Sequence, residues 1–329
     1  MTIKEVAKLA DTSISAVSRV INNSGYVKKE VRNRIQKVLD ETGYRPNAFA
    51  KALHQKTSHT IGVILPKINS TSSGDNIAGI TDYISSKGYS VLLGNTNHSI
   101  EKEIEFIKIF QEKKVDGIIL ISTIITDEHK EIISKINIPF VIIGQDSGEL
   151  APCVIFDEME AANDLTKHLI KKGRKNIAFI GVDEKDVAVG LDRKNGYKKA
   201  ISSNLNQINE DFIGTGDFTV ESGYKICKNI FERSKIKPDA IFAVTDKMAI
   251  GAINYLIENG YKIPEDISIC GMGGGFISEY YNPKLTTAFY DFKKEGAEGA
   301  KLLYSLIQNK KISKEKVILK HKLIERESS

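Results

Sequence analysis

Residues 13 to 22 combine side chains that can recognise base edges in DNA. The stretch Ser13-Ile14-Ser15-Ala16-Val17-Ser18-Arg19 starts with a residue suited to capping a helix and places Arg19 about one turn further on. The planar guanidinium of Arg19 could donate to guanine O6 and N7, Ser15 could contact a base or phosphate, and Ile14 could meet a thymine methyl group. The chemistry indicated is sequence-specific binding of double-stranded DNA. The predicted contacts in this stretch are Ser13, Ile14, Ser15, Ala16, Arg19 and Asn22.

The spacing of apolar residues predicts three short helices that would position these contacts. Thr2 can cap the first helix and Ser13 the second, and apolar positions recur every three or four residues from Val27 to Leu39. Gly43 suits the left-handed cap that ends a helix, whereas Lys28 stands where a capping side chain would be expected. In a helix-turn-helix of this kind, the N-terminal residues of the second helix face the major groove.

Positive charge is concentrated at the same end of the chain. Residues 1–57 contain 11 Lys and Arg against 5 Asp and Glu, a net charge of +6, whereas the other residues contain 36 against 37. The +5 charge of the whole chain is therefore carried by its N-terminal part, as expected for a surface that neutralises phosphates. A small helical bundle whose basic side chains are merely solvated is the alternative that helix spacing alone leaves open.

The segment that follows, residues 43–53, adds an independent signal. Pro46 ends the third helix, Asn47 can cap a new one, and the chain to Leu53 makes only about two turns, too few to be stable alone. We expect this short helix to order against a second copy and DNA, where Leu53 could wedge between base steps of the minor groove. The predicted DNA contacts in this segment are Asn47, Ala50 and Leu53.

Together these motifs resemble the head and hinge of the lactose-repressor (LacI) family of bacterial transcriptional regulators. The stretches that carry the resemblance are Val6-Ala7, Val17-Ser18-Arg19-Val20-Ile21-Asn22, Gly43-Tyr44-Arg45-Pro46-Asn47 and Ala50-Lys51-Ala52-Leu53. The resemblance implies a DNA-binding head at residues 1–46, a hinge helix and linker at 47–58, and an effector-binding core over 59–287 and 288–329. It also implies a homodimer on operator DNA.

Composition and length are those of an ordinary globular protein. The chain has 329 residues, of which 41% are hydrophobic and 27% charged. It has no apolar run near the length of a membrane span and no signal peptide, so we expect a cytoplasmic location and no membrane partner. The cysteines Cys153, Cys227 and Cys270 are far apart and lack a neighbouring Cys or His, which indicates buried reduced thiols rather than a metal or redox site.

After residue 59 the pattern alternates between strands and helices, which predicts parallel sheets with crossover helices. Strands are predicted at 60–65, 89–94, 117–122 and 140–143 in a first series, and at 176–181, 240–244 and 267–271 in a second series beginning near Cys153. Helices are predicted at 74–86, 100–113, 127–135, 159–171, 189–202, 220–233 and 246–259, followed by a helix at 292–308 and a strand at 317–323.

The fold class predicted is α/β, with a helix-turn-helix head and a two-lobed core similar to the periplasmic sugar-binding proteins. Because one helix and one strand are too few for a further domain, we expect the chain to return to the first lobe and then to the second. The N-lobe is predicted at about 59–145 plus 288–316, and the C-lobe at 146–287 plus 317–329.

Ligands of open parallel sheets bind outside the carboxyl ends of the strands, so the loops there should hold the effector. The family resemblance implies that Arg193 binds sugar hydroxyls, for which its forked donors are suited. Phe218 and Phe292 match apolar positions against which family effectors stack, although core packing stays open for both. The predicted effector-binding residues are Asn69, Ser70, Ser122, Gln145, Arg193, Phe218, Thr245, Asp246 and Phe292.

Two departures from the family pattern affect this site. Thr245 precedes Asp246 where the family often has Asn, and Gly273 stands where a carboxylate typically holds sugar hydroxyls. Gly273 would favour a wider or more anion-tolerant site, so a sugar phosphate is as plausible as a free sugar. The loops here, notably Ile142-Ile143-Gly144-Gln145, locally resemble the sucrose and trehalose operon repressors.

No catalytic constellation, metal site or phosphate-cradling loop is found, and Gly271-Met272-Gly273-Gly274-Gly275 lacks the residues of a nucleotide motif. We therefore expect a dimeric repressor of carbohydrate-utilisation genes, without cofactor or enzymatic activity, that responds to a small carbohydrate between its lobes. The rivals are a sugar-binding transport receptor and an α/β enzyme of sugar or nucleotide metabolism with an accessory head. A tetramer is not expected, because residues 324–329 show no leucine heptads.

Overall fold

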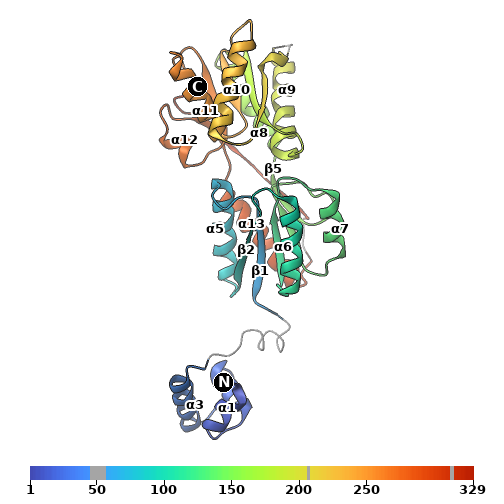
Figure 1. Ribbon diagram of the computed structural model, residues 1–329, viewed down its shortest axis with the longest axis vertical. Helices are drawn as coiled ribbons and strands as arrows, with labels where there is room; N and C mark the ends of the chain where they lie inside the picture. The colour runs from blue at the N-terminus through green and yellow to red at the C-terminus, as the bar shows by residue number, and fades with distance from the viewer. Residues whose placement is uncertain (45–56, 206–207, 312–314) are drawn as a thin grey trace. The chain divides into compact units, whose positions relative to one another are not determined.

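The computed structural model describes residues 1–44, 57–205, 208–311 and 315–329, and the chain divides into two compact units, Met1–His59 and Thr60–Ser329 (Figure 1). The predicted DNA contacts Asn47, Ala50 and Leu53 lie outside the described residues. Within the described ranges, no helix is long and apolar enough to cross a membrane.

The first unit contains the three helices that the apolar spacing predicts. They are α1 (Ile3–Leu9), α2 (Ile14–Ile21) and α3 (Lys29–Thr42). Thr2 caps α1 through a capping box with Glu5, and Ser13 Oγ accepts from Ala16 N at 3.2 Å. Lys28 makes no capping hydrogen bond, as its side chain suggests, and Gly43 ends α3 with a left-handed backbone, φ 60°. A small apolar core joins the helices through Val6, Ala7, Ala10, Val17, Val20 and Ile35.

The second unit contains two lobes, each built on one six-stranded sheet. The sheet of the first lobe has the order β11-β5-β4-β3-β1-β2 and is parallel throughout. Its strands are β1 (Thr60–Leu65), β2 (Ser90–Asn95), β3 (Gly117–Ile121), β4 (Phe140–Ile143), β5 (Cys153–Phe156) and β11 (Lys316–Leu319). Its helices are α5 (Thr71–Ser85), α6 (Ile100–Glu112), α7 (Asp127–Lys135) and α13 (Phe292–Ile307). In Figure 1 the late helix α13 lies beside the early helix α5.

The sheet of the second lobe has the order β12-β10-β9-β8-β6-β7, in which only β12 runs antiparallel to its neighbour. Its strands are β6 (Ile177–Val182), β7 (Ile213–Gly216), β8 (Ala240–Ala243), β9 (Ser268–Gly273), β10 (Thr286–Phe289) and β12 (Lys322–Ile324). Its helices are α8 (Glu158–Lys171), α9 (Arg193–Asn204), α10 (Val220–Arg233), α11 (Asp246–Glu258) and α12 (Phe276–Tyr280). Short π and 3₁₀ segments, η1 (Val187–Asp192) and η2 (Glu210–Phe212), precede α9 and β7.

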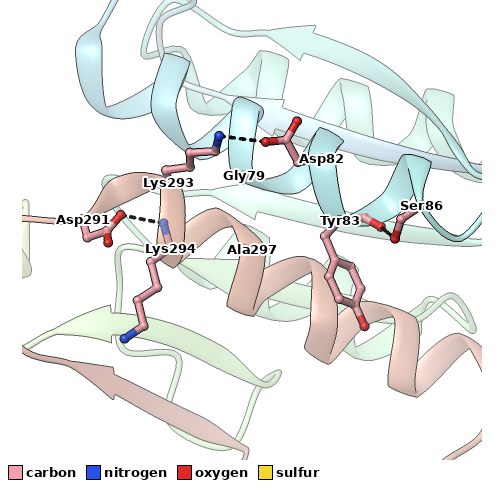
Figure 2. A pocket seen from close by; sticks show the side chains of 8 residues that line it. All are labelled: Gly79, Asp82, Tyr83, Ser86, Asp291, Lys293, Lys294 and Ala297. Carbon is pink, nitrogen blue, oxygen red and sulfur yellow. Dashed lines mark hydrogen bonds and ion pairs between the residues drawn. The ribbon is translucent and has the colours of Figure 1, made fainter.

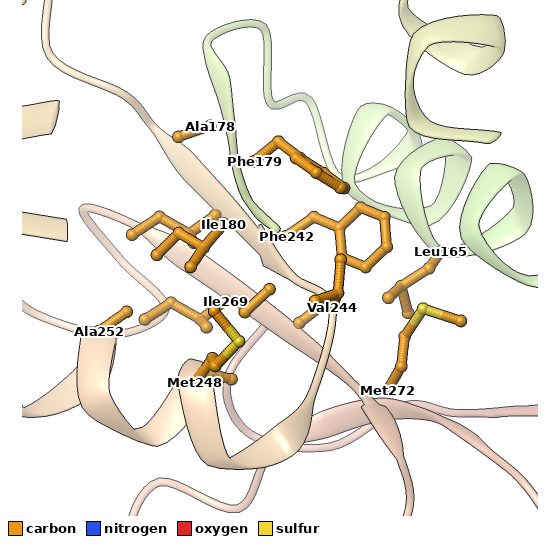
Figure 3. Close-up of a cluster of buried hydrophobic side chains, with 14 of the residues drawn as sticks. Leu165, Ala178, Phe179, Ile180, Phe242, Val244, Met248, Ala252, Ile269 and Met272 are labelled. Atoms are coloured by element: carbon orange, nitrogen blue, oxygen red, sulfur yellow. The ribbon is translucent and has the colours of Figure 1, made fainter. Parts of the chain in front are cut away.

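Fully buried aromatic side chains anchor the core of the second lobe. Phe179 and Phe242, from the neighbouring strands β6 and β8, meet edge to face with ring centroids 5.3 Å apart (Figure 3). Tyr197 of α9 packs on Phe179 and donates its hydroxyl to Ile177 O at 2.8 Å. These contacts fix α9, and with it the N-terminal residue Arg193, against the sheet.

The predicted lobe boundaries need two corrections. β5 pairs with β4 and β11, so the strand near Cys153 belongs to the first lobe rather than beginning the second. The single strand predicted at 317–323 is two strands, because β11 stays in the first sheet and only β12 joins the second. The short strands β7 and β10 were missed, since Ile213–Gly216 and Thr286–Phe289 carry little hydrophobic pattern.

The chain passes between the lobes at three described places, which we call the crossings. They lie between β5 and α8, between β10 and α13, and between β11 and β12. Asp157 and Asp291 cap the helices that follow the first two crossings, and they share nearly the same backbone conformation, with φ −81° and −80°. The aromatic residues that precede them, Phe156 and Tyr290, stack with ring centroids 4.2 Å apart. Two crossings are therefore packed directly against each other.

Candidate functional site

The exposed face of α2 carries the predicted DNA contacts. Val17 and Val20 point into the core of the head, whereas Ser13, Ser15, Arg19 and Asn22 are exposed. Ile14 is 43% exposed, so its apolar side chain is accessible to another molecule. Ala16, the remaining predicted contact, is half-buried on the same helix.

Arg19 has the setting expected of a side chain that meets DNA. Within the described part of the chain, no carboxylate pairs with it, in contrast to Arg34, whose Nη1 lies 3.9 Å from Asp11 Oδ2. The stem of Arg19 passes over Gly25, where an added Cβ would lie 3.5 Å from Arg19 Cδ. The backbone of Gly25 has φ +68°, so the turn after α2 favours glycine and leaves room for the arginine stem.

The predicted effector residue Arg193 is buried, with an exposed fraction of 5%, and it is paired with a carboxylate. Its Nε donates to Glu158 Oε2 at 2.7 Å and its Nη2 to Glu158 Oε1 at 3.1 Å, while Nη1 donates to Val244 O. Burial is the largest single influence and lowers the pKa of Arg193, but the charge and hydrogen bond of Glu158, together with Tyr290 and Asp186, outweigh it and keep that pKa above its usual value. The guanidinium is thus fixed and charged before any ligand arrives.

Tyr290 completes this cluster from the second crossing. Its hydroxyl donates to Glu158 Oε2 at 2.5 Å, and its ring lies 5.4 Å from Arg193 Cζ. Burial, followed by the charge of Glu158, holds the pKa of Tyr290 well above its ordinary value, so its proton stays in place. Phe292, a predicted apolar wall, packs edge-on against Tyr290 and Phe156, each at 5.8 Å, and so forms part of the aromatic packing at the crossings.

Gln145 joins the two lobes across the carboxyl ends of their sheets. Its Nε2 donates to Thr123 O at 2.7 Å in its own lobe and to Asp186 Oδ1 at 2.8 Å in the other. Ser122, which follows the adjacent strand, uses its hydroxyl to donate to Ile124 O at 3.0 Å. Desolvation raises the pKa of Asp186 above its ordinary value, although the hydrogen bonds from Val189 and Gln145 oppose the rise.

Asp246 is buried and largely committed to its own lobe. Its Oδ2 accepts from Gly274 N at 2.7 Å and Gly275 N at 3.1 Å, and its Oδ1 accepts from Thr287 Oγ1 at 2.7 Å. Burial raises its pKa, and the hydrogen bond from Thr287 lowers it in part. Thr245, the cap of α11, accepts from Met248 N at 3.3 Å.

Gly273 lies beside the carboxyl group of Asp246. An added Cβ at Gly273 would lie 3.3 Å from Asp246 Oδ2, so a carboxylate is present although residue 273 lacks one. The backbone at Gly273, with φ +125°, is itself unsuited to a side chain. The expectation that Gly273 gives a wider or more anion-tolerant site stays a prediction.

Phe218 meets an aromatic partner from the opposite lobe. Its ring is nearly parallel to that of His98, with 8° between the planes and 6.5 Å between the centroids. Both residues have positive φ, +69° and +63°, a backbone conformation that non-glycine residues adopt rarely. Ser70 caps α5 by accepting from Ser73 N at 3.1 Å, and Asn69 beside it is exposed.

Sequence reasoning missed four residues that shape this region: Glu158, Asp186, Tyr290 and His98. Glu158 and Tyr290 were missed because β5 was assigned to the wrong lobe and β10 was not predicted, so the loops after them were not inspected. Asp186 lay within a loop that was inspected, but only its capping of η1 distinguishes it. His98 follows β2 and had no sequence signal of its own.

A separate hollow of about 550 Å³ lies between α5 and α13 in the first lobe, and it shares no residue with the predicted effector site. Figure 2 shows its lining, including the ion pair of Lys293 Nζ with Asp82 Oδ2 at 2.8 Å. In the described residues no group of three or more His, Cys, Asp or Glu could hold a metal ion. Cys153, Cys227 and Cys270 are free cysteines, and their predicted burial is confirmed.

Both units of the chain are similar to known protein families. A family model of bacterial regulatory proteins of the lacI family matches residues 2–47, and a model of a periplasmic binding protein-like domain matches residues 166–329. The HTH-type transcriptional regulator RegA of Clostridium saccharobutylicum is 32% identical over 329 residues, covering 100% of this chain and 99% of RegA.

Solved structures agree with this similarity along the whole chain. A lac repressor dimer bound to operator and the anti-inducer ONPF superposes with a TM-score of 0.90 and 25% identity, covering 100% of this chain and 98% of that one. A complex of the transcriptional regulator CelR with cellobiose gives a TM-score of 0.77 and 26% identity, and 100% of each chain is covered.

Proposed function

The chain belongs to the LacI family of bacterial regulatory proteins, and on that premise we propose that it represses carbohydrate-utilisation genes under the control of a small sugar. It is a DNA-binding transcriptional regulator rather than an enzyme. In the proposed mechanism, two copies bind a near-palindromic operator through α2 and residues 47–53. The sugar binds between the lobes and changes operator affinity by favouring one lobe arrangement over another.

The observation that carries the proposal is the pairing of an exposed recognition face with a prepared polar site. Helix α2 (Ile14–Ile21) has an exposed polar face that includes Arg19, and the N-terminal part of the chain carries the net positive charge. In the second unit, Arg193 and Gln145 are held in place at the carboxyl ends of the two sheets, where ligands of such folds bind. The relative solved with cellobiose supports a sugar as the class of ligand.

We favour a neutral sugar over a sugar phosphate. Arg193 is the buried cation of this region, and Glu158 already neutralises it. The carboxyl groups of Asp186 and Asp246 are also buried there, so a phosphate would meet acids rather than unpaired cations. Hydroxyl groups can both donate to these oxygens and accept from guanidinium or amide N–H groups, which suits a neutral polyol.

Footprinting of the purified protein on DNA upstream of its own and neighbouring genes tests the proposal. A protected, near-palindromic site whose occupancy changes with one sugar among cellobiose, sucrose, trehalose and fructose would support it. The matched phosphorylated sugars serve as controls and are expected to leave occupancy unchanged. Protection that no sugar alters would contradict the effector part, and the absence of any protected site would contradict the proposal as a whole.

A further inference from the structure

Resting on the proposed role of Arg193 in sugar binding, we infer that Glu158 is the positioning residue that presents Arg193 to the sugar and connects it, through Tyr290, to the crossings. Glu158 is the first residue of α8, directly after the first crossing. Its side chain is about nine-tenths buried, and both of its oxygens accept from the same guanidinium. The inference concerns how a ligand bound at Arg193 reaches the parts of the chain that join the lobes.

The hydrogen bonds of the Arg193 guanidinium support the role of Glu158 in orienting Arg193 toward the sugar. An arginine side chain has five N–H groups in a rigid planar fork. Three of them donate to Glu158 and Val244, which leaves one N–H on each terminal nitrogen for a ligand. Because the fork is planar, fixing three donors also fixes the directions of the other two, so the sugar meets donors that are already oriented.

A carboxylate is required at position 158 for this arrangement. Two parallel N–H donors need two acceptor oxygens, and an amide offers only one oxygen while its NH₂ group would face a guanidinium N–H. The guanidinium of Arg193 would then lose one of its two hydrogen bonds to residue 158 and rotate, and its two free N–H groups would no longer point in fixed directions. Glu158 therefore acts on the sugar through Arg193 without touching it.

Tyr290 gives the pair its connection to the second crossing. The Tyr290 hydroxyl donates to the same Glu158 oxygen that accepts from Arg193 Nε, and its ring stacks on Phe156 of the first crossing. A change in the angle between the lobes alters the backbone at both crossings, and with it the position of Glu158. Conversely, a sugar that holds Arg193 in one position favours the lobe angle that suits it.

The alternative is that Arg193 and Glu158 are only a buried ion pair that stabilises the second lobe. The two roles differ in their response to substitution. Glu158→Gln preserves side-chain size and removes charge, whereas Glu158→Asp preserves charge and shortens the side chain. Packing alone predicts that Gln is the milder change, while presentation of Arg193 by a carboxylate predicts that Asp is the milder change for sugar affinity.

Calorimetric titration of the full-length protein with cellobiose, sucrose, trehalose and fructose tests the inference. We expect the sugar that binds the wild type to bind Glu158→Gln at least about tenfold more weakly. The sugar affinity of Glu158→Asp should lie between those of the wild type and Glu158→Gln. Glu160→Gln is the matched control, because Glu160 lies on the same helix and pairs with Lys199 of α9 at 3.9 Å in an exposed ion pair. It should stay within about twofold of wild type.

Tyr290→Phe tests the connection to the crossings. We expect it to reduce the effect of the sugar on operator affinity more than it reduces sugar affinity, because the ring stays and only the hydroxyl contact to Glu158 is lost.

Wild-type affinity in Glu158→Gln, or a Glu158→Asp variant weaker than Glu158→Gln, would overturn the inference and leave the proposed function standing. An undiminished effect of the sugar on operator affinity in Tyr290→Phe would overturn the link to the crossings. If the wild type itself binds none of these sugars, the effector part of the proposed function fails and the inference fails with it.

Discussion

At the scale of single residues, two arginines of this chain have opposite settings. Arg19 is exposed on α2 and, among the described residues, has no carboxylate partner, so its donors are available to bases and phosphates. Arg193 is 5% exposed and bidentately bound to Glu158, so its remaining donors are fixed in direction. An exposed guanidinium can adapt to DNA on binding, whereas a buried one can select a small ligand by shape.

The exposure of Arg19 leads to a prediction for DNA binding. Arg19→Ala should weaken operator binding by about 1–3 kcal/mol and relax the preference at one base pair in each half-site, because a base-edge contact is lost. Lys37→Ala, on the outer surface of α3 where Lys37 pairs with Glu41 at 3.8 Å, is the control for a simple loss of charge. Gel-shift titrations on operator variants would measure both effects. Unchanged base preference in Arg19→Ala would rule out the assigned contact.

The buried carboxyl group of Glu295 in the first lobe leads to a prediction that the stability of the protein depends on pH. Its carboxyl group is buried and accepts from Asn76 Nδ2 at 2.9 Å, and burial raises its pKa from 4.5 to about 8. Between these values the folded protein holds a proton that the unfolded chain has released, so stability falls as pH rises, by up to about 1.4 kcal/mol per pH unit. Glu295→Gln removes this dependence and should stabilise the protein more at about pH 8 than at about pH 5.5.

Urea unfolding of the wild type and Glu295→Gln at the two pH values measures the difference. Glu298→Gln is a suitable control, since Glu298 pairs with Lys301 at 3.0 Å on the same helix but nearer the surface. A stability difference between the wild type and Glu295→Gln that is the same at both pH values would show that Glu295 does not titrate in this window.

At the scale of elements, the pair α5 and α13 shows how closely two helices can approach through glycine. An added Cβ at Gly296 would lie 2.1 Å from Asn76 O, and one at Gly79 would lie 1.9 Å from Lys293 O. Gly296→Ala should therefore force the helices apart and destabilise the protein by about 1–3 kcal/mol or more. Gly74→Ala, where an added Cβ meets nothing within 4 Å, should instead stabilise it by about 0.4–1 kcal/mol. Thermal unfolding of the two variants would contradict this explanation if both shifted stability in the same direction.

The elements also show what could and could not be predicted from sequence. The helices of the head and most strands of the core carry strong periodic patterns, so their positions follow from local chemistry. Sheet membership does not, because β5 is a buried apolar strand that would fit either lobe, and its partner β11 comes more than a hundred residues later. The same error affected the candidate site. Glu158 follows β5, and it can be assigned to the site only once β5 is known to end at a crossing.

At the scale of the whole molecule, regulation requires that one chain carry two sites with linked affinities. The first unit, Met1–His59, contains most of the proposed DNA contacts, and the second, Thr60–Ser329, contains the proposed sugar site. If both proposals hold, thermodynamic linkage requires each ligand to change the affinity of the other by the same factor. A single head offers few base contacts, because the recognition helix α2 spans only Ile14–Ile21. High specificity therefore requires two heads on one DNA site, so we expect assembly to be part of the function.

The last prediction concerns that assembly. We expect the protein to sediment as a dimer, at about twice the chain mass of 36.5 kDa, and to bind a palindromic operator far more tightly than DNA carrying a single half-site. The operator complex should also weaken steeply with salt, because the N-terminal residues 1–57 carry a net charge of +6 in each copy. Sedimentation velocity at micromolar concentration and titrations of both DNAs at two salt concentrations measure these properties. Equal affinity for the half-site and the palindrome would mean that one head acts alone, and a species of four chains would refute the dimer directly.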